Sequence, residues 1–190
     1  MDVTVLKDIV VPLISVTTLL FTVGTFWWNN WRRGTLRAGI PRTFGAHQDA
    51  KTVRVLLPVA ISNTGAIPIV VTALRLKIGE HSPVTLAWQA TRPSMRLRGD
   101  ETFEYAANFI VPGRASIVKC CEFVKRLPQD GQTVALQEGH NSVTLEALWE
   151  GRPQWVQIGE FELFVDPERD SDLRSAYLIW DNEHALPADA

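Results

Sequence analysis

This chain of 190 residues is 46% hydrophobic and 21% charged, which excludes an intrinsically disordered protein and a coiled-coil rod. Its 19 basic and 21 acidic residues give a formal net charge of −2, too balanced for the basic surface of a nucleic-acid-binding protein. Two cysteines are too few for a disulfide-stabilised secreted scaffold. We therefore expect one globular domain and no nucleic-acid partner.

The first segment of the chain predicts a transmembrane helix over residues 9–31, preceded by a short tail, 1–8. From Ile9 to Trp31 no side chain is charged. A helix of this length rises about 34 Å, enough to cross a hydrocarbon core about 30 Å thick, and Pro12 would lie in its first turn. A signal peptide would instead have a positively charged start and small residues at its cleavage site. Aromatic and basic side chains that suit a membrane–water interface end the segment: Trp27, Trp28, Trp31, Arg32 and Arg33.

The distribution of basic residues predicts the orientation of this helix. Lys7 is the basic residue before the apolar segment, whereas several follow it closely: Arg32, Arg33, Arg37, Arg42 and Lys51. This bias places the C-terminal domain in the cytoplasm and the chain in the inner membrane as a single-pass protein. Cys120 and Cys121 agree, because adjacent cysteines rarely bridge each other and free thiols suit a reducing compartment. A periplasmic domain is the alternative.

One face of the predicted helix is polar. Its residues follow one another at steps of three and four: Ser15, Thr18, Thr22, Thr25 and Asn29. Small hydroxylated residues let transmembrane helices approach closely and form interhelical hydrogen bonds. Alternatively, each hydroxyl bonds a carbonyl of its own helix. We expect this face to mediate self-association or association with another membrane protein.

The rest of the chain predicts an all-β domain. A basic juxtamembrane segment, 32–45, leads into a domain over 46–165, and an acidic C-terminal tail, 166–190, follows. In that tail only Ala176–Trp180 looks able to pair. We expect an immunoglobulin-like antiparallel β-sandwich, with a small β-barrel as the alternative. Short runs rich in β-branched residues and bounded by turn residues predict the strands: Val53–Ser62, Ile67–Ile78, Val84–Gln89, Thr102–Val111, Ser116–Val124, Val143–Trp149 and Val156–Val165.

Two segments of this domain resemble CARDB-like sandwich domains. The first is VAISNTGAIPIVVTALRLKIG, in which Asn63-Thr64-Gly65 joins two apolar strands, and the second is NFIVPGRASIVKCCEFV. The resemblance covers about a quarter of the chain. It implies a β-sandwich with an adhesion or scaffolding role, and it names no ligand.

No pattern in the sequence predicts catalysis, a metal site or a cofactor. The four histidines are scattered, and alternation along a strand would bury one of Cys120 and Cys121 as a structural residue. The acidic run 166–172 lacks the glycine and the closing glutamate of a Ca²⁺ loop. Paired glutamates, Glu101 with Glu104 and Glu160 with Glu162, fit water-facing positions better than acid–base work.

The sequence therefore predicts a function in binding. We expect a non-enzymatic module, anchored in the lipid bilayer, that recruits or senses a partner at the cytoplasmic face of a bacterial membrane; the sequence does not identify a protein partner. The alternative is a periplasmic module that binds a ligand or glycan through tryptophans. Against that use, Trp149 and Trp155 could simply pair across a hairpin.

Overall fold

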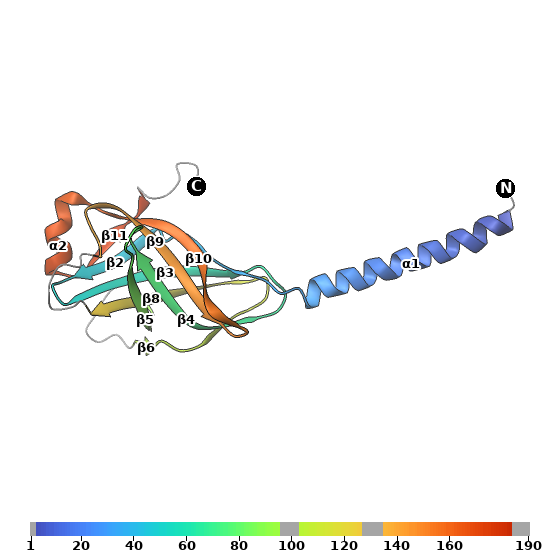
Figure 1. Cartoon of the computed structure of the whole chain (residues 1–190), viewed down its shortest axis with the longest axis horizontal. Coiled ribbons are helices and arrows are strands. Elements are labelled where there is room, and N and C mark those ends of the chain that lie inside the picture. Colours follow the sequence, from blue (N-terminus) through green and yellow to red (C-terminus); the bar gives the residue numbers. More distant parts are fainter. Residues whose placement is uncertain (1–2, 96–102, 127–134, 184–190) are drawn as a thin grey trace.

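The computed structural model describes residues 3–95, 103–126 and 135–183. A long N-terminal helix projects from one end of a β-rich domain (Figure 1). In chain order the elements are α1 (Val3–Asn30), β1 (Leu36–Ala38), β2 (Thr43–Gln48), β3 (Thr52–Asn63), β4 (Ile69–Ile78), β5 (Val84–Arg92), β6 (Glu104–Tyr105), β7 (Phe109–Val111), β8 (Ser116–Arg126), β9 (Gly139–Trp149), β10 (Arg152–Val165), η1 (Pro167–Arg169), α2 (Asp170–Ser175) and β11 (Leu178–Asp181).

Helix α1 is long and apolar enough, over Ile9–Asn30, to span a membrane, and none of that segment is buried inside the protein. The helix begins at Val3, earlier than predicted, so its 28 residues rise about 42 Å. Pro12 therefore lies in the interior of α1 and not in its first turn, which corrects the prediction. Its missing N–H removes one intrahelical hydrogen bond.

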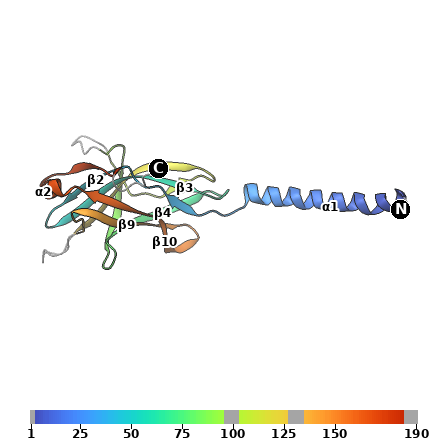
Figure 2. The same ribbon diagram turned by 90° about the horizontal axis from the view of Figure 1, so that it is seen from above.

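The described strands belong to one antiparallel sheet, which confirms the all-β prediction. The strand order is β10-β9-β4-β5-β8-β3-β2-β11, with β1 beside β3, β6 beside β5 and β7 beside β4. The sheet curls into a half-barrel around one core (Figures 1 and 2). A sandwich of two sheets is not confirmed, and the barrel alternative is compatible with this sheet. Alternation along β3 turns Val53, Val55 and Leu57 into the core.

The two segments that resemble CARDB-like domains contain strands at the predicted positions, but neither is a hairpin. Strand β3 pairs with β1, β2 and β8, whereas β4 pairs with β5, β7 and β9. Strands β7 and β8 likewise have different neighbours. Each turn therefore links two strands that do not pair with each other.

A buried asparagine joins the two edges of the curled sheet. Asn182, which follows β11, is 0% exposed. Its Oδ1 accepts a hydrogen bond from the backbone N–H of Phe164 in β10 at 2.9 Å. Its Nδ2 donates to the backbone oxygens of Glu162 at 2.8 Å and Pro41 at 3.1 Å. One side chain thus takes the place of a missing strand partner along β10.

The segment expected as an acidic tail is structured over its described part. Asp166 Oδ1 accepts a hydrogen bond from the backbone of Glu168 at the start of η1, and α2 follows. The predicted pairing segment is confirmed, since β11 pairs with β2 and Trp180 is buried against Phe44. Short α2 gives no amphipathic period that sequence reasoning could detect.

The pH dependence of stability should depend on Glu146, a buried residue of β9. Burial raises the pKa of its carboxyl, but hydrogen bonds from Lys77 and Arg75 outweigh burial and hold the pKa below the ordinary 4.5. Because the folded-state pKa is lowered, this carboxylate stabilises the fold above pH 4.5, and the contribution disappears as the pH falls through the lowered value.

We expect Glu146→Gln to lower the free energy of unfolding at pH 7 by about 1–3 kcal/mol. The difference from the unmodified chain should shrink as the pH falls below 4.5. Urea unfolding at a series of pH values measures both effects. Glu104→Gln, at an exposed position, is the control. A difference that stays constant with pH would contradict the role of this ion pair.

Candidate functional site at the helix-proximal end of the domain

Four segments gather at the end of the domain nearest α1: the linker 31–35 and the turns 63–68, 112–115 and 149–153. Strands β3, β7 and β9 end there, and β4, β8 and β10 begin there. The pictures from both directions show these turns facing the helix (Figures 1 and 2). The basic residues of this end are Arg32, Arg33, Arg114 and Arg152, and its acidic residue is Glu150.

Backbone hydrogen bonds fasten the linker to the domain. Ala66 N–H donates to the carbonyl of Arg32 at 2.8 Å, and Thr64 N–H donates to the carbonyl of Thr35 at 3.1 Å. These bonds require Gly34 and Gly65 to lie in contact: a Cβ on either would stand 2.0 Å from the other's backbone nitrogen. Gly65 does not have a positive φ, so its role is this close approach.

Arg114, in the turn before β8, caps the end of α1. Its guanidinium donates to the carbonyl oxygen of Trp28 at 2.7 Å and to Asn29 Oδ1 at 3.1 Å. The last carbonyls of a helix lack intrahelical partners and carry partial negative charge, so a cation there is favourable. Arg114 has a φ of 54°, and its N–H donates to the carbonyl of Gly65 at 2.8 Å. The helix and the domain are thus joined at two places.

The predicted interface residues surround this junction. Trp27, Trp28 and Trp31 are 50–63% exposed. Arg32 folds back, with its Cζ 4.2 Å from the centroid of the Trp28 ring, and donates to the carbonyl of Thr64. Arg33 is exposed. Arg32 therefore belongs to the junction, whereas Arg33 is available at the surface.

The predicted polar face of α1 is exposed, and three of its hydroxyls bond to the helix backbone. Ser15, Thr18 and Thr22 each donate to the carbonyl four residues earlier, at 2.8–2.9 Å. Asn29 accepts from Arg114 and so also serves the junction. Helix association through this face, which also includes Thr25, stays a prediction.

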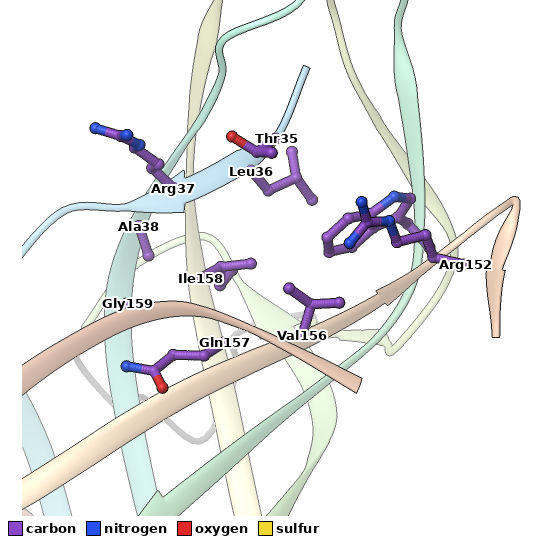
Figure 3. Close-up of a pocket in the computed structure, with 10 residues that line it drawn as sticks. Thr35, Leu36, Arg37, Ala38, Arg152, Val156, Gln157, Ile158 and Gly159 are labelled. Atoms are coloured by element: carbon purple, nitrogen blue, oxygen red, sulfur yellow. The ribbon is translucent and has the colours of Figure 1, made fainter. Parts of the chain in front are cut away.

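A cleft lies where the two sides of the curled sheet come together, between β1 and β10. We call it the seam cleft, and its volume is about 450 Å³. Figure 3 shows Leu36, Ala38, Val156 and Ile158 around this space, while Arg37 points away. The lining consists of Thr35, Leu36, Arg37, Ala38, Trp149, Arg152, Val156, Gln157, Ile158 and Gly159.

A second cavity of about 340 Å³ adjoins the seam cleft, because Trp149 and Arg152 line both. We call it the basic cavity. The guanidinium carbon of Arg152 lies 5.7 Å from the centroid of the Trp149 ring. The lining consists of Arg33, Gly34, Ile67, Pro68, Ile69, Val70, Trp149, Glu150, Gly151 and Arg152.

Arginines on the outer face of the sheet have carboxylate partners, unlike several arginines at the helix-proximal end. Arg54 and Arg92 contact Glu122, and Arg75 contacts Glu146. By contrast, within the described ranges no carboxylate pairs with Arg33, Arg37 or Arg152. Free cations beside an apolar cleft can hold an amphipathic anion.

Both cysteines considered as catalytic residues are buried or half-buried, and two of the glutamates are bonded to other side chains. Cys121 is buried, which raises the pKa of its thiol to about 12, and burial also raises the pKa of half-buried Cys120. Glu160 bonds Gln157, and Glu162 bonds His140. Among the described residues, no three His, Cys, Asp or Glu side chains could hold a metal ion. Glu101, His184 and the side chains of 170–172 lie outside the described part.

The tryptophans of the domain do not form an open platform. Trp88, Trp149 and Trp180 are at most 8% exposed. Trp155 lies beneath Arg75, whose Cζ is 4.3 Å from the ring centroid, instead of pairing with Trp149. Sequence reasoning identified Arg33 but missed Arg152 and the seam cleft, because the residues of the cleft come from segments more than 100 positions apart.

No family model matches this chain, and no curated protein matches it. Two solved structures are similar to it at a distance. One, described as an ApaA protein from Bordetella pertussis, is 17% identical and covers 72% of this chain and 97% of its own, with a TM-score of 0.33. The other, a protein from Archaeoglobus fulgidus, is 8% identical and covers 79% of this chain and 95% of its own, with a TM-score of 0.32. Likenesses this distant say nothing about function.

Proposed function

We propose that this protein is a single-pass, membrane-anchored, non-enzymatic interaction module whose β-domain recruits or senses a partner at the cytoplasmic face of a bacterial inner membrane. The observation that carries the proposal is the junction at Arg32, Gly65 and Arg114. It bonds the helix end directly to the domain. A domain fastened in this way presents one fixed end to the bilayer, whereas a flexible linker would present any surface.

Charge supports the cytoplasmic orientation. The end that would face the lipid headgroups carries four arginines and one glutamate, Glu150. Anionic lipids of a cytoplasmic leaflet attract each basic side chain near the surface by about 1 kcal/mol. The periplasmic, glycan-binding alternative has less support, because three domain tryptophans are buried.

We also propose that the β-domain is related to immunoglobulin-like domains of the CARDB type. The support for this relationship is the pair of turns at 63–65 and 112–114, each of which links strands that do not pair with each other, as connections in sandwiches do. A protein partner would find exposed apolar side chains at Tyr105, Ile110 and Val118. These positions are 59–74% exposed, and the partner that covers them is unidentified.

The orientation can be tested by cysteine labelling in intact cells. The native thiols are poor reporters, since burial raises the pKa of both. A new cysteine at exposed Glu80 avoids this difficulty. In Glu80→Cys we expect labelling by a membrane-permeant maleimide and none by an impermeant one.

The matched variant Asp2→Cys lies before the apolar segment and should react with both reagents, because the proposal exports the N-terminus. The unmodified chain, with only its native Cys120 and Cys121, measures the background. Labelling of Glu80→Cys by the impermeant reagent would overturn the cytoplasmic orientation and favour the periplasmic alternative.

A further inference from the structure

The seam cleft and the basic cavity together form one site with an apolar part and a charged part. The seam cleft presents Leu36, Val156 and Ile158, all apolar. The basic cavity adds the guanidinium groups of Arg33 and Arg152. Arg152 lines both parts, and Figure 3 shows its side chain at the border of the seam cleft. A ligand that fills both parts must itself have an apolar and an anionic end.

Strand β10 is irregular where it borders the seam cleft. The register of β10 against β9 shifts between Arg152 and Val156 and again between Gln157 and Gly159. Such bulges bend a strand away from a regular path. At Gly159 strand β10 approaches β1 closely, because a Cβ on Gly159 would lie 2.9 Å from the Cβ of Ala38. The apolar cleft thus lies where an irregular stretch of β10 passes β1.

Charge in the basic cavity favours an anion. Arg33 and Arg152 are exposed and have no carboxylate partner among the described residues, and Glu150 is the acidic residue of the lining. Two cations against one carboxylate leave the cavity positive. Guanidinium groups bind phosphate with paired, charge-assisted hydrogen bonds.

The site lies close to the bilayer. Thr35, which lines the seam cleft, follows the helix end by a segment, 31–35, that spans at most about 18 Å. The tryptophans at the helix end mark the level of the headgroups if α1 crosses the membrane. Of the amphipathic anions that could fill the site, a membrane phospholipid is thus the nearest.

We propose that this site binds one anionic phospholipid of the membrane that α1 crosses. Its phosphate lies between Arg33 and Arg152, and one acyl chain enters the seam cleft between β1 and β10. The inference rests on the proposed membrane anchoring and adds a lipid ligand to it. Through that lipid the position of the domain depends on the composition of the surrounding leaflet.

The test uses the full chain in nanodiscs that contain phosphatidylcholine and phosphatidylglycerol, with bound lipid identified by native mass spectrometry. We expect one retained phosphatidylglycerol per chain. Arg33→Gln and Arg152→Gln should each lower retention roughly tenfold, the loss of one charged hydrogen-bonding partner. Arg126→Gln removes the same charge from an exposed side chain at the opposite end of β8, outside both cavities, and it should retain the lipid. Val156→Trp, which fills the seam cleft, should also lower retention.

Three results would overturn the lipid site: equal retention of phosphatidylcholine, equal losses in Arg126→Gln and Arg152→Gln, or unchanged retention in Val156→Trp. Thermal unfolding of each variant shows whether a loss comes from the site or from the fold. Failure of the unmodified chain to enter nanodiscs or to sediment with membranes would instead refute the anchoring itself. A chain that enters nanodiscs and retains no phosphatidylglycerol refutes the lipid site alone.

Discussion

Asn182→Ala is expected to lower the free energy of unfolding by about 3–5 kcal/mol, the largest effect of any exchange considered for this protein. The substitution removes three hydrogen bonds at once and leaves the N–H of Phe164 and the carbonyl oxygens of Glu162 and Pro41 without that partner. Since Asn182 is fully buried, water cannot replace the amide without opening the two edges of the sheet.

Denaturant unfolding of the full chain in detergent micelles, followed by tryptophan fluorescence, measures this effect. Asn108→Ala, at an exposed asparagine, is the matched control and should change the free energy of unfolding by less than about 0.5 kcal/mol. A loss below about 1 kcal/mol in Asn182→Ala would contradict the role of this side chain in joining β10 to the opposite edge.

Gly65→Ala is expected to break the junction between helix and domain, with a loss of about 2–3 kcal/mol. Its Cβ would stand 2.0 Å from the backbone nitrogen of Gly34 and 2.4 Å from its Cα. Backbone atoms cannot rotate away as a side-chain end could, so the linker must move. Gly34→Ala creates the same clash from the other side, and combining the two should cost little more than either alone.

Trypsin cleavage after Arg32 and Arg33 reports the opening of the linker and should become faster in both variants. Gly39→Ala is the matched control, because its Cβ would meet the nearest atom, the Cβ of Ala60, at an ordinary 3.7 Å. An unchanged cleavage rate in Gly65→Ala would show that the linker is not fastened through these glycines.

Local patterns in the sequence determined the elements of this protein. The charge-free run from Ile9 to Trp31 is enough to specify an apolar helix, because hydropathy acts residue by residue. Alternation of apolar and polar residues located the strands, and it predicted that one of the two adjacent cysteines lies in the core; the structure shows that this is Cys121. The interface arginines were also visible, since they follow the apolar run directly.

Only the tertiary structure decided how these elements close and what site they form. Strand periodicity shows which side of a strand is buried, but it does not show which strands pair. The sequence therefore did not determine how the sheet curls. The amide of Asn182 carries no pattern of its own: its partners at Pro41 and Phe164 meet it only after both ends of the sheet come together. The seam cleft has the same origin, because β1 and β10 lie far apart in the chain and are neighbours only in the closed fold.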